Sequence, residues 1–186
     1  MDKFRIHSES ATLLIIDLQE KLMPAMKDND KVIKNTKILL ALAKEYDMPV
    51  IVTEQYPRGL GATINEIKEE LPDHYYYLDK MTFSAWGQEM QEALKTIGTK
   101  GSQTIIVVGC ETHVCVFQTV RDLLARGYNI HVVRDGVCSR FEENYENGLA
   151  LMHDMGAVIN NTETIVFDCL FRAEGASFKV MSAQIK

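Results

Sequence analysis

The chain has 186 residues and a mass of 21.1 kDa, enough for one domain, and we expect residues 1–186 to form it. Apolar residues make up 46% of the sequence and charged residues 25%, which excludes a disordered or collagen-like chain. The net charge of −6 and the lack of a basic stripe argue against a nucleic-acid partner, since such binding depends on neutralising phosphates. We therefore expect the partner to be a small molecule or a second copy of the chain.

The sequence also indicates where the protein resides. No segment approaches the ~20 consecutive apolar residues that cross a bilayer. The N-terminal segment MDKFRIHSES carries charges but is not followed by the apolar core of a signal peptide. The chain has 4 cysteines without the spacing of a disulfide framework, as expected of a reduced protein. These features predict a cytoplasmic protein without membrane contacts.

Short apolar runs alternate along the chain with longer segments of helical period, a pattern typical of β-α-β units. The expected strands cover residues 11–17, 49–54, 74–80, 102–109, 129–134 and 157–160. The expected helices cover residues 32–43, 63–71, 85–97, 112–126, 142–155 and 164–170, followed by a last helix with Phe178, Met181 and Ile185 on one face. Helices between successive strands predict a mostly parallel sheet in a three-layer α/β/α sandwich.

Ligand sites in such a sheet lie beyond the carboxyl ends of the strands. Here those ends carry Asp17, Glu54–Tyr56, Lys80, Gly109–Cys115 and Asp135. Loops that bind phosphate need several glycines, but the turn after the first strand has none and GCETHVC has a single one. A nucleotide site of the Rossmann or P-loop type is therefore not expected.

Cys115 is the candidate nucleophile among these residues. It follows the fourth strand, in the first turn of the helix expected from Thr112. Unpaired backbone N–H groups and the positive end of the helix dipole favour a thiolate there and can stabilise an oxyanion. The alternative is that Cys115 is a small, buried apolar side chain.

Asp17 and Lys80 add an acid and a cation at the ends of two other strands. A carboxylate after an apolar strand is costly unless it is paired, and a thiol beside an ammonium ionises more readily. The carboxylate can take the thiol proton and later return it to a leaving group. Taken singly, Asp17 is equally explained as a helix N-cap, and Lys80 as a solvated loop lysine.

The sequence predicts neither a metal site nor a cofactor. His113 lies between Cys110 and Cys115, but this spacing lacks the paired ligands of zinc sites. Cys169 is expected in the core, and Cys138 is compatible with a buried or an exposed position.

Three segments resemble the isochorismatase-like cysteine hydrolase superfamily, namely ATLLIIDLQEKLM, DKMTFSAW and VVGCETHVCVFQTVRDLLARGYNIHVVRDGVCSR. Two further segments are similar to its branch of isochorismatase domain-containing hydrolases, namely TEQYPRGLGAT and the tail TETIVFDCLFRAEGASFKVMSAQIK. The resemblance extends from Thr12 to the C-terminal helix. It implies a single isochorismatase-like hydrolase domain over residues 1–186, with a Rossmann-like sheet of six parallel strands in the order 3-2-1-4-5-6.

The resemblance further implies a catalytic triad of Asp17, Lys80 and Cys115. In these roles Asp17 is the general base, Lys80 stabilises the thiolate and orients Asp17, and Cys115 attacks a carbonyl to form a thioester. A non-proline cis peptide bond is implied between Cys110 and Glu111. The backbone N–H groups of Glu111 and Cys115 would then form the oxyanion hole.

Two departures from the family pattern narrow the expected reaction. Nicotinamidases of the family bind a metal through an Asp/His/His set after the second strand, whereas TEQYPRGLGAT contains no histidine. True isochorismatases lack the nucleophilic cysteine, whereas this chain has Cys115. We therefore expect a metal-independent hydrolase of a small amide-like C–N bond. The alternatives are a catalytically silent or redox-responsive binding module and a flavodoxin-like nucleotide binder, which the missing glycines oppose.

The substrate pocket, the assembly and one acidic residue complete the expectations. The expected pocket residues are Gln19, Tyr56, Phe83, Trp86 and Phe117, of which the aromatic ones are equally explained as core. Apolar stretches in the C-terminal tail predict a homo-oligomer, at least a dimer, because exposed apolar patches mark interfaces. Glu111 is expected to turn its carboxylate away from Cys115, toward a helix cap or an arginine such as Arg140, because a negative charge beside the thiolate opposes its ionisation.

Overall fold

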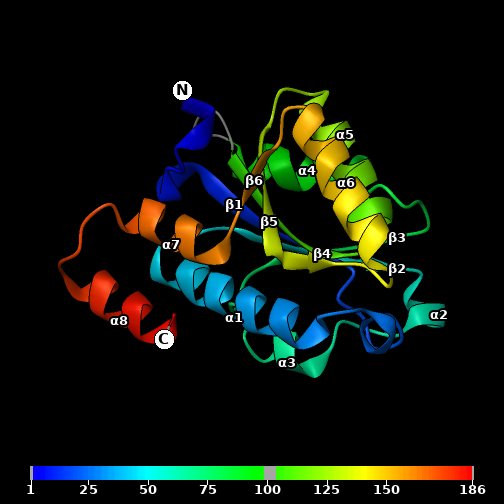
Figure 1. Cartoon of the computed structure of the whole chain (residues 1–186), viewed down its shortest axis with the longest axis horizontal. Helices are drawn as coiled ribbons and strands as arrows, with labels where there is room; N and C mark the ends of the chain where they lie inside the picture. The colour runs from blue at the N-terminus through cyan, green and yellow to red at the C-terminus, as the bar shows by residue number, and fades with distance from the viewer. Residues whose placement is uncertain (1, 99–103, 186) are drawn as a thin grey trace.

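Six parallel strands form one sheet through the middle of the molecule, in the order β3-β2-β1-β4-β5-β6 (Figure 1). The computed structural model describes residues 2–98 and 104–185. The strands are β1 (Ala11–Ile16), β2 (Val50–Gln55), β3 (Tyr76–Lys80), β4 (Thr104–Cys110), β5 (Asn129–Cys138) and β6 (Val158–Asn160). Every residue of β1, β2 and β4 is buried, which explains the nearly continuous apolar sequences of β1 and β4 and the apolar first half of β2. The predicted strand order is confirmed.

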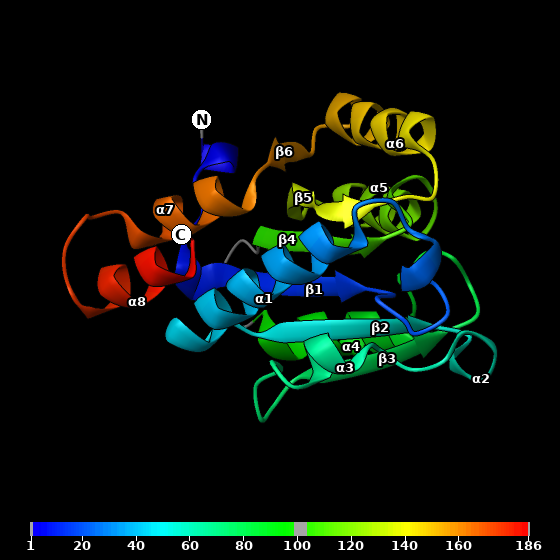
Figure 2. The same ribbon diagram turned by 60° about the horizontal axis from the view of Figure 1, so that its bottom comes forward.

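Helices cover both faces of this sheet (Figure 2). One face carries α1 (Asn29–Glu45), α3 (Asn65–Lys68), α7 (Thr162–Leu170) and α8 (Ala176–Gln184). The other face carries α4 (Gln88–Ile97), α5 (Phe117–Leu124) and α6 (Glu142–Asp154). The remaining helical segments are α2 (Pro57–Leu60), the 3₁₀ helices Asp2–Phe4, Ser8–Ser10 and Met23–Ala25, and the π-helix η4 (Thr112–Val116).

The alternation of side chains along β1 divides the core into two apolar layers. Leu13 and Ile15 belong to the cluster under α1, whereas Leu14 and Ile16 belong to the cluster under α4, α5 and α6. Successive strand residues point to opposite faces, so a strand buried on both sides needs apolar residues throughout. The predicted three-layer α/β/α sandwich is therefore confirmed. No helix in the described ranges is long and apolar enough to cross a membrane.

Several predicted boundaries were wrong. The third strand begins at Tyr76 rather than at residue 74, and the third helix at Gln88 rather than at residue 85. Residues 102 and 103 of the predicted fourth strand lie outside the described residues. β5 continues past residue 134 to Cys138, because a register shift between Val107 and Gly109 lets its end pair with β4 again. The helix predicted over residues 112–126 is divided into the π-helix and α5.

Gly109 lets the ends of β1 and β4 approach closely. Its φ is +130°, a conformation that L side chains rarely adopt, and a Cβ built there would lie 2.1 Å from the carbonyl oxygen of Ile16. Asp17 directly follows Ile16, and the π-helix follows β4. The glycine therefore brings together the two chain segments that carry Asp17 and Cys115.

Candidate active site

Asp17 is a fully buried carboxylate just beyond the end of β1. Its Oδ1 accepts a hydrogen bond from the Thr53 hydroxyl at 2.7 Å, and its Oδ2 accepts one from the Lys80 ammonium at 2.7 Å. Its backbone N–H donates to the Thr53 carbonyl oxygen at 3.1 Å. Both carboxylate oxygens are thus paired, as a charge buried away from water requires. These contacts, rather than helix capping, account for Asp17.

Lys80 ends β3 with a side chain that is only 7% exposed. Besides Asp17, its ammonium donates to Oε1 of Gln55 at 2.8 Å and to the Thr82 carbonyl oxygen at 3.5 Å. A solvated loop lysine would lack such partners, so that alternative is wrong. The predicted acid and cation form a buried ion pair.

Cys115 lies in the π-helix that follows β4 and is 6% exposed. The pKa of its thiol is raised to about 12, first by burial and then by the negative charge of Asp17, against the positive charge of Lys80, which lowers it. Lys80 thus acts in the predicted direction, since its ammonium lowers the pKa of the thiol, but burial and the carboxylate outweigh it. A pKa raised to this extent favours the protonated thiol at neutral pH, and both Asp17 and Lys80 lie close enough to act on the sulfur.

The residues that join β4 to the π-helix match two expectations. The peptide bond between Cys110 and Glu111 is cis. Oε2 of Glu111 accepts hydrogen bonds from the backbone N–H of Arg140 at 3.1 Å and from its Nε at 3.0 Å. The predicted pairing of Glu111 with Arg140 is confirmed.

Cys110 contributes to the same corner of the molecule from the end of β4. It is fully buried, and its thiol donates to the backbone carbonyl oxygen of Asp17 at 3.1 Å. A hydrogen bond shared with Cys138 and burial hold the pKa of the Cys110 thiol well above its usual range. Cys138 and Cys169 are both buried, so Cys169 takes the core position predicted for it.

The predicted pocket residues have several different environments. Gln19 is fully buried, and its amide donates to the carbonyl oxygens of Gln55 and Gly61, which fastens the loop after β2. Trp86 packs against the apolar cluster under α4 and α5, with the Arg126 guanidinium 4.1 Å from the centroid of its ring. Phe117 is partly buried in the same cluster, whereas Tyr56 and Phe83 are 46% and 53% exposed. The structure thus brings Asp17, Lys80 and Cys115 together and gives Gln19 and Trp86 other partners.

Two residues of β2 contact the buried ion pair without having been predicted to do so: Thr53 was not singled out, and Gln55 was included only as part of the strand-end run Glu54–Tyr56. Thr53 binds Asp17, and Gln55 binds Lys80. The signal that could have found them is the run of three polar residues, Thr53–Gln55, at the carboxyl end of a strand that begins with three apolar ones.

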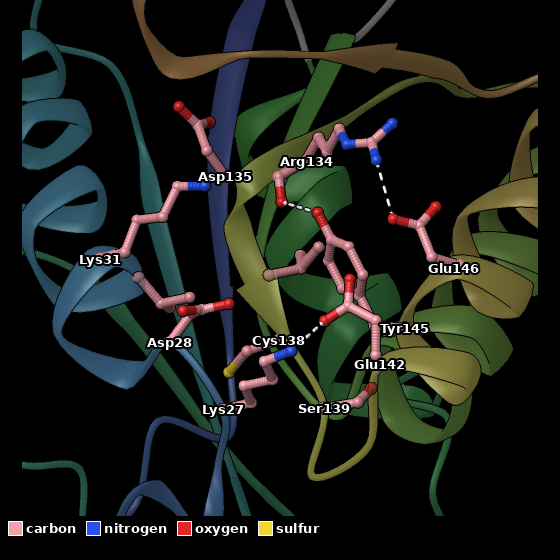
Figure 3. A pocket seen from close by; sticks show the side chains of 12 residues that line it. Lys27, Asp28, Lys31, Arg134, Asp135, Cys138, Ser139, Glu142, Tyr145 and Glu146 are labelled. Atoms are coloured by element: carbon pink, nitrogen blue, oxygen red, sulfur yellow. Dashed lines mark hydrogen bonds and ion pairs between the residues drawn. The ribbon is translucent and has the colours of Figure 1, made fainter.

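A separate cavity of about 170 Å³ lies between the start of α1, the end of β5 and α6 (Figure 3). Ion pairs of 2.7 Å between Lys27 and Glu142 and of 2.8 Å between Arg134 and Glu146 border it. Asp135 also lines it, with Oδ1 accepting hydrogen bonds from the backbone N–H and the hydroxyl of Thr162 at 2.9 Å. Asp17, Lys80 and Cys115 do not line this cavity, and Asp135 is engaged at the start of α7.

The segment after β2, where nicotinamidases are expected to carry metal ligands, is organised by a carboxylate. Oε1 of Glu54 accepts hydrogen bonds from the backbone N–H and hydroxyl of Thr63 at 2.6 and 2.8 Å, and Oε2 accepts one from the Tyr77 hydroxyl at 2.8 Å. Within residues 2–98 and 104–185, no cluster of three His, Cys, Asp or Glu side chains is placed to bind a metal ion.

The sheet order, the two helical layers and the polar residues at the strand ends define an isochorismatase-like hydrolase fold. The isochorismatase domain model matches residues 11–164, and the chain belongs to this family. Family membership supports a hydrolase-type function.

Relatives of known sequence match nearly the whole chain. The "Secreted isochorismatase effector Isc1" of Phytophthora sojae (strain P6497) is 35% identical over 98% of this chain and 87% of its own length. "Isochorismatase domain-containing protein 2" of Danio rerio is 34% identical over 94% of this chain and 86% of its own length. The branch indicated by the sequence motifs is therefore confirmed.

Solved structures share the fold. The structure of a protein named MAR1 ribonuclease, from Caenorhabditis elegans, superimposes with a TM-score of 0.91 at 35% identity, over 97% of this chain and 92% of that one. The Escherichia coli YcaC protein, described as an octameric hydrolase of unknown specificity, has a TM-score of 0.88 at 24% identity, over 97% and 90% of the two chains. The second likeness shows the fold alone.

Proposed function

We propose that the protein is a metal-independent cysteine hydrolase that cleaves a small amide-like C–N bond through a thioester on Cys115. The observation that carries the proposal is a buried thiol beside the 2.7 Å Asp17–Lys80 ion pair at the carboxyl edge of the sheet. A nucleophile beside a base that is itself oriented by a third group is the arrangement that activates cysteines in hydrolases.

In the first half of the reaction, Asp17 takes the proton of the Cys115 thiol as the sulfur attacks the substrate carbonyl carbon. Transfer of the proton neutralises the carboxylate, which leaves the Lys80 cation free to stabilise the negative charge on sulfur and then on the tetrahedral intermediate. The protonated Asp17 gives its proton to the departing nitrogen, the C–N bond breaks, and an amine or ammonia leaves. Cys115 is then held as a thioester.

In the second half, a water molecule loses a proton to Asp17 and attacks the thioester carbonyl. The C–S bond breaks, a carboxylic acid leaves, and the proton on Asp17 returns to the sulfur. One water is consumed for each bond cleaved, and the site returns to its starting protonation state. The backbone N–H groups of Glu111 and Cys115 are the proposed donors to the oxyanion.

The raised pKa of Cys115 supports this order of steps. A thiol that stays protonated at neutral pH needs a base in contact with it at the moment of attack, and Asp17 is that base. The 6% exposure of Cys115 also favours a small substrate, because a bulky one would not reach the sulfur. Metal independence is supported by the segment after β2, where Glu54 is engaged by Thr63 and Tyr77 and no histidine is present.

The test is turnover of a panel of small primary and secondary amides, followed by release of ammonia or amine. The expected result is hydrolysis by the wild-type chain in the presence of a chelator, and loss of at least about 10³-fold in Cys115→Ala. Cys169→Ala is the matched control, because it removes another buried cysteine without touching the site. Full turnover by Cys115→Ala would contradict the mechanism, as would chelator-sensitive turnover.

A second candidate function is ribonuclease activity, favoured by the name MAR1 ribonuclease that the Caenorhabditis elegans protein carries at 35% identity to this chain. The net charge of −6 opposes it, since RNA binding requires phosphate neutralisation. The same experiment includes an arm with single-stranded and double-stranded RNA. We expect no cleavage above that of a mock preparation; cleavage that disappears in Cys115→Ala would instead establish this second function.

We also propose that the protein forms a homo-oligomer. Phe171, between α7 and α8, is 75% exposed, and Val180 on α8 is 46% exposed. The octameric state described for the Escherichia coli protein is consistent with assembly. Light scattering at micromolar concentration is expected to give at least a dimer, and a strictly monomeric mass would contradict this. The cytoplasmic location stays a prediction, because one relative is named a secreted effector.

A further inference from the structure

β2 lies between the strand that presents Asp17 and the strand that presents Lys80, yet it contributes none of the three proposed reacting side chains. Thr53 and Gln55 are two positions apart on β2, so their side chains lie on the same face of the strand. Glu54 lies between them and is used elsewhere, by Thr63 and Tyr77. One face of β2 is thus turned toward the ion pair.

Thr53 fixes Asp17 through two contacts. Its hydroxyl donates to Oδ1 at 2.7 Å, and its backbone carbonyl accepts from the Asp17 N–H at 3.1 Å. The Lys80 ammonium occupies the other oxygen, Oδ2. The rotation of the carboxylate about its last side-chain bond is therefore fixed from both sides.

Gln55 fixes Lys80, and chemistry dictates the orientation of its amide. Its Nε2 donates to the Met81 carbonyl oxygen at 2.9 Å, and its Oε1 accepts from the Lys80 ammonium at 2.8 Å. A carbonyl cannot donate and an ammonium cannot accept, so the reversed amide would lose both bonds. The side chain of Gln19 holds the Gln55 backbone by accepting from its N–H at 2.7 Å and donating to its carbonyl at 3.0 Å.

We propose that β2 supplies the two positioning residues of this site, Thr53 for Asp17 and Gln55 for Lys80. The inference rests on the proposed cysteine hydrolase function. Neither residue takes part in a bond change: Thr53 acts through the carboxylate that receives the thiol proton, and Gln55 acts through the ammonium that faces the developing negative charge.

The neutrality of Gln55 matters for that second role. A carboxylate in its place would pair with Lys80 and cancel its charge. With a neutral acceptor at Gln55, Asp17 is the only carboxylate of the described residues in an ion pair with Lys80. When Asp17 takes the thiol proton, the full positive charge of Lys80 then acts on the sulfur.

The test uses alkylation of Cys115 by iodoacetamide as a function of pH, located by peptide mass spectrometry, which needs no substrate. The titratable groups that act on this thiol are Asp17 after β1, Lys80 on β3 and Cys110 on β4. Gln55→Met keeps the side-chain length but removes one acceptor of Lys80, which loosens the position of the ammonium, so the cation acts less on the sulfur. We expect alkylation at a fixed pH to slow at least about threefold in the wild-type background and to be unchanged in the Lys80→Met background, a coupling typical of residues in contact.

Thr53 is tested in the same way through Asp17. Thr53→Val removes the hydroxyl at nearly constant volume, so the carboxylate charge acts more strongly on the thiol and alkylation slows. Thr53→Ser keeps the hydroxyl and is expected to behave like the wild type. The effect of Thr53→Val should vanish in the Asp17→Asn background. Gln91→Met, at an exposed position of α4, is the control for the glutamine substitution.

Equal effects of Gln55→Met with and without Lys80, or of Thr53→Val with and without Asp17, would overturn the proposal, because a purely structural role predicts independence from the partner. Thermal unfolding checks that each variant is folded. If Gln55→Met does not fold, the comparison of Thr53→Val with Thr53→Ser tests the proposal. Failure of the hydrolase proposal would give a different result: the wild type would turn over no amide, although Thr53 and Gln55 would still be coupled to the reactivity of the Cys115 thiol.

Discussion

Replacing Asp17 with asparagine should make Cys115 chemically more reactive while it abolishes turnover. Asp17 contributes to the raised pKa of the thiol through its negative charge and its hydrogen bond, and Lys80 acts in the opposite direction. Asp17→Asn removes the negative charge and leaves the cation, so the thiolate becomes easier to form. The same substitution removes the base that the reaction requires, so hydrolysis stops.

The size of the effect can be estimated from the thiol of the wild-type chain. With a pKa of about 12, about one part in 10⁴ of the Cys115 thiol is ionised at pH 8. An ordinary cysteine, with a pKa of about 8.5, is ionised to about one quarter at that pH. Wild-type Cys115 should therefore react with iodoacetamide about 10³-fold more slowly than a free cysteine, and Asp17→Asn should recover part of that difference.

The assay compares the pH dependence of Cys115 alkylation in the wild type, in Asp17→Asn and in Lys80→Met, with the urea-unfolded chain as the reference for an unperturbed thiol. Lys80→Met should slow alkylation, because it removes the one charge that favours the thiolate. All four cysteines are buried, so the rates must be read from individual peptides. A wild-type profile centred near pH 8.5, or slower alkylation in Asp17→Asn, would show that Asp17 does not raise the pKa of this thiol.

Three further predictions concern the surroundings of the site. Glu111→Gln breaks the ion pair with Arg140 and should lower the free energy of unfolding by about 0.5–1 kcal/mol in urea titration, while kcat changes less than about twofold; a larger loss in kcat would contradict this. Gly109→Ala places a Cβ against the backbone of Ile16 and should cost about 3 kcal/mol or more, so a stability equal to wild type would show that the approach of β1 and β4 is not tight. Burial raises the pKa of Cys169 to about 12, so above about pH 8.5 the unfolded chain releases this proton while the folded chain keeps it. The free energy of unfolding should therefore fall as the pH rises from about 8.5 toward 12. Cys169→Ala should reduce the steepness of that fall by about 1.4 kcal/mol per pH unit.

Much of the fold could be predicted from the sequence because parallel strands that are buried on both faces have continuous apolar sequences. Fully buried strands such as β1 and β4 appear as apolar runs, and the helices between them imply the parallel connections. The six-strand order came from the family resemblance rather than from the pattern. Edge strand β3 was less well predicted, because Tyr75 and Tyr77 look like buried strand residues but are 42% and 50% exposed.

The meeting of Asp17, Lys80 and Cys115 followed from their positions at the strand ends, whereas the state of the thiol did not. The pKa of Cys115 depends on how deeply the tertiary structure buries it, and no local pattern reports that. The contacts of Thr53 and Gln55 depend on the register between neighbouring strands, where Gln55 pairs with Lys80. That register is set by the whole sheet and cannot be read from β2 alone.

Trapping the acyl-enzyme intermediate would show whether Cys115 is the nucleophile. The chain is mixed with an amide that it turns over, quenched in acid within one turnover, and digested for peptide mass spectrometry. We predict the mass of the acyl group on Cys115 alone, its loss on treatment with hydroxylamine, and no adduct in Cys115→Ala. Turnover without an acyl group on Cys115, or an adduct on another residue, would exclude the proposed thioester mechanism.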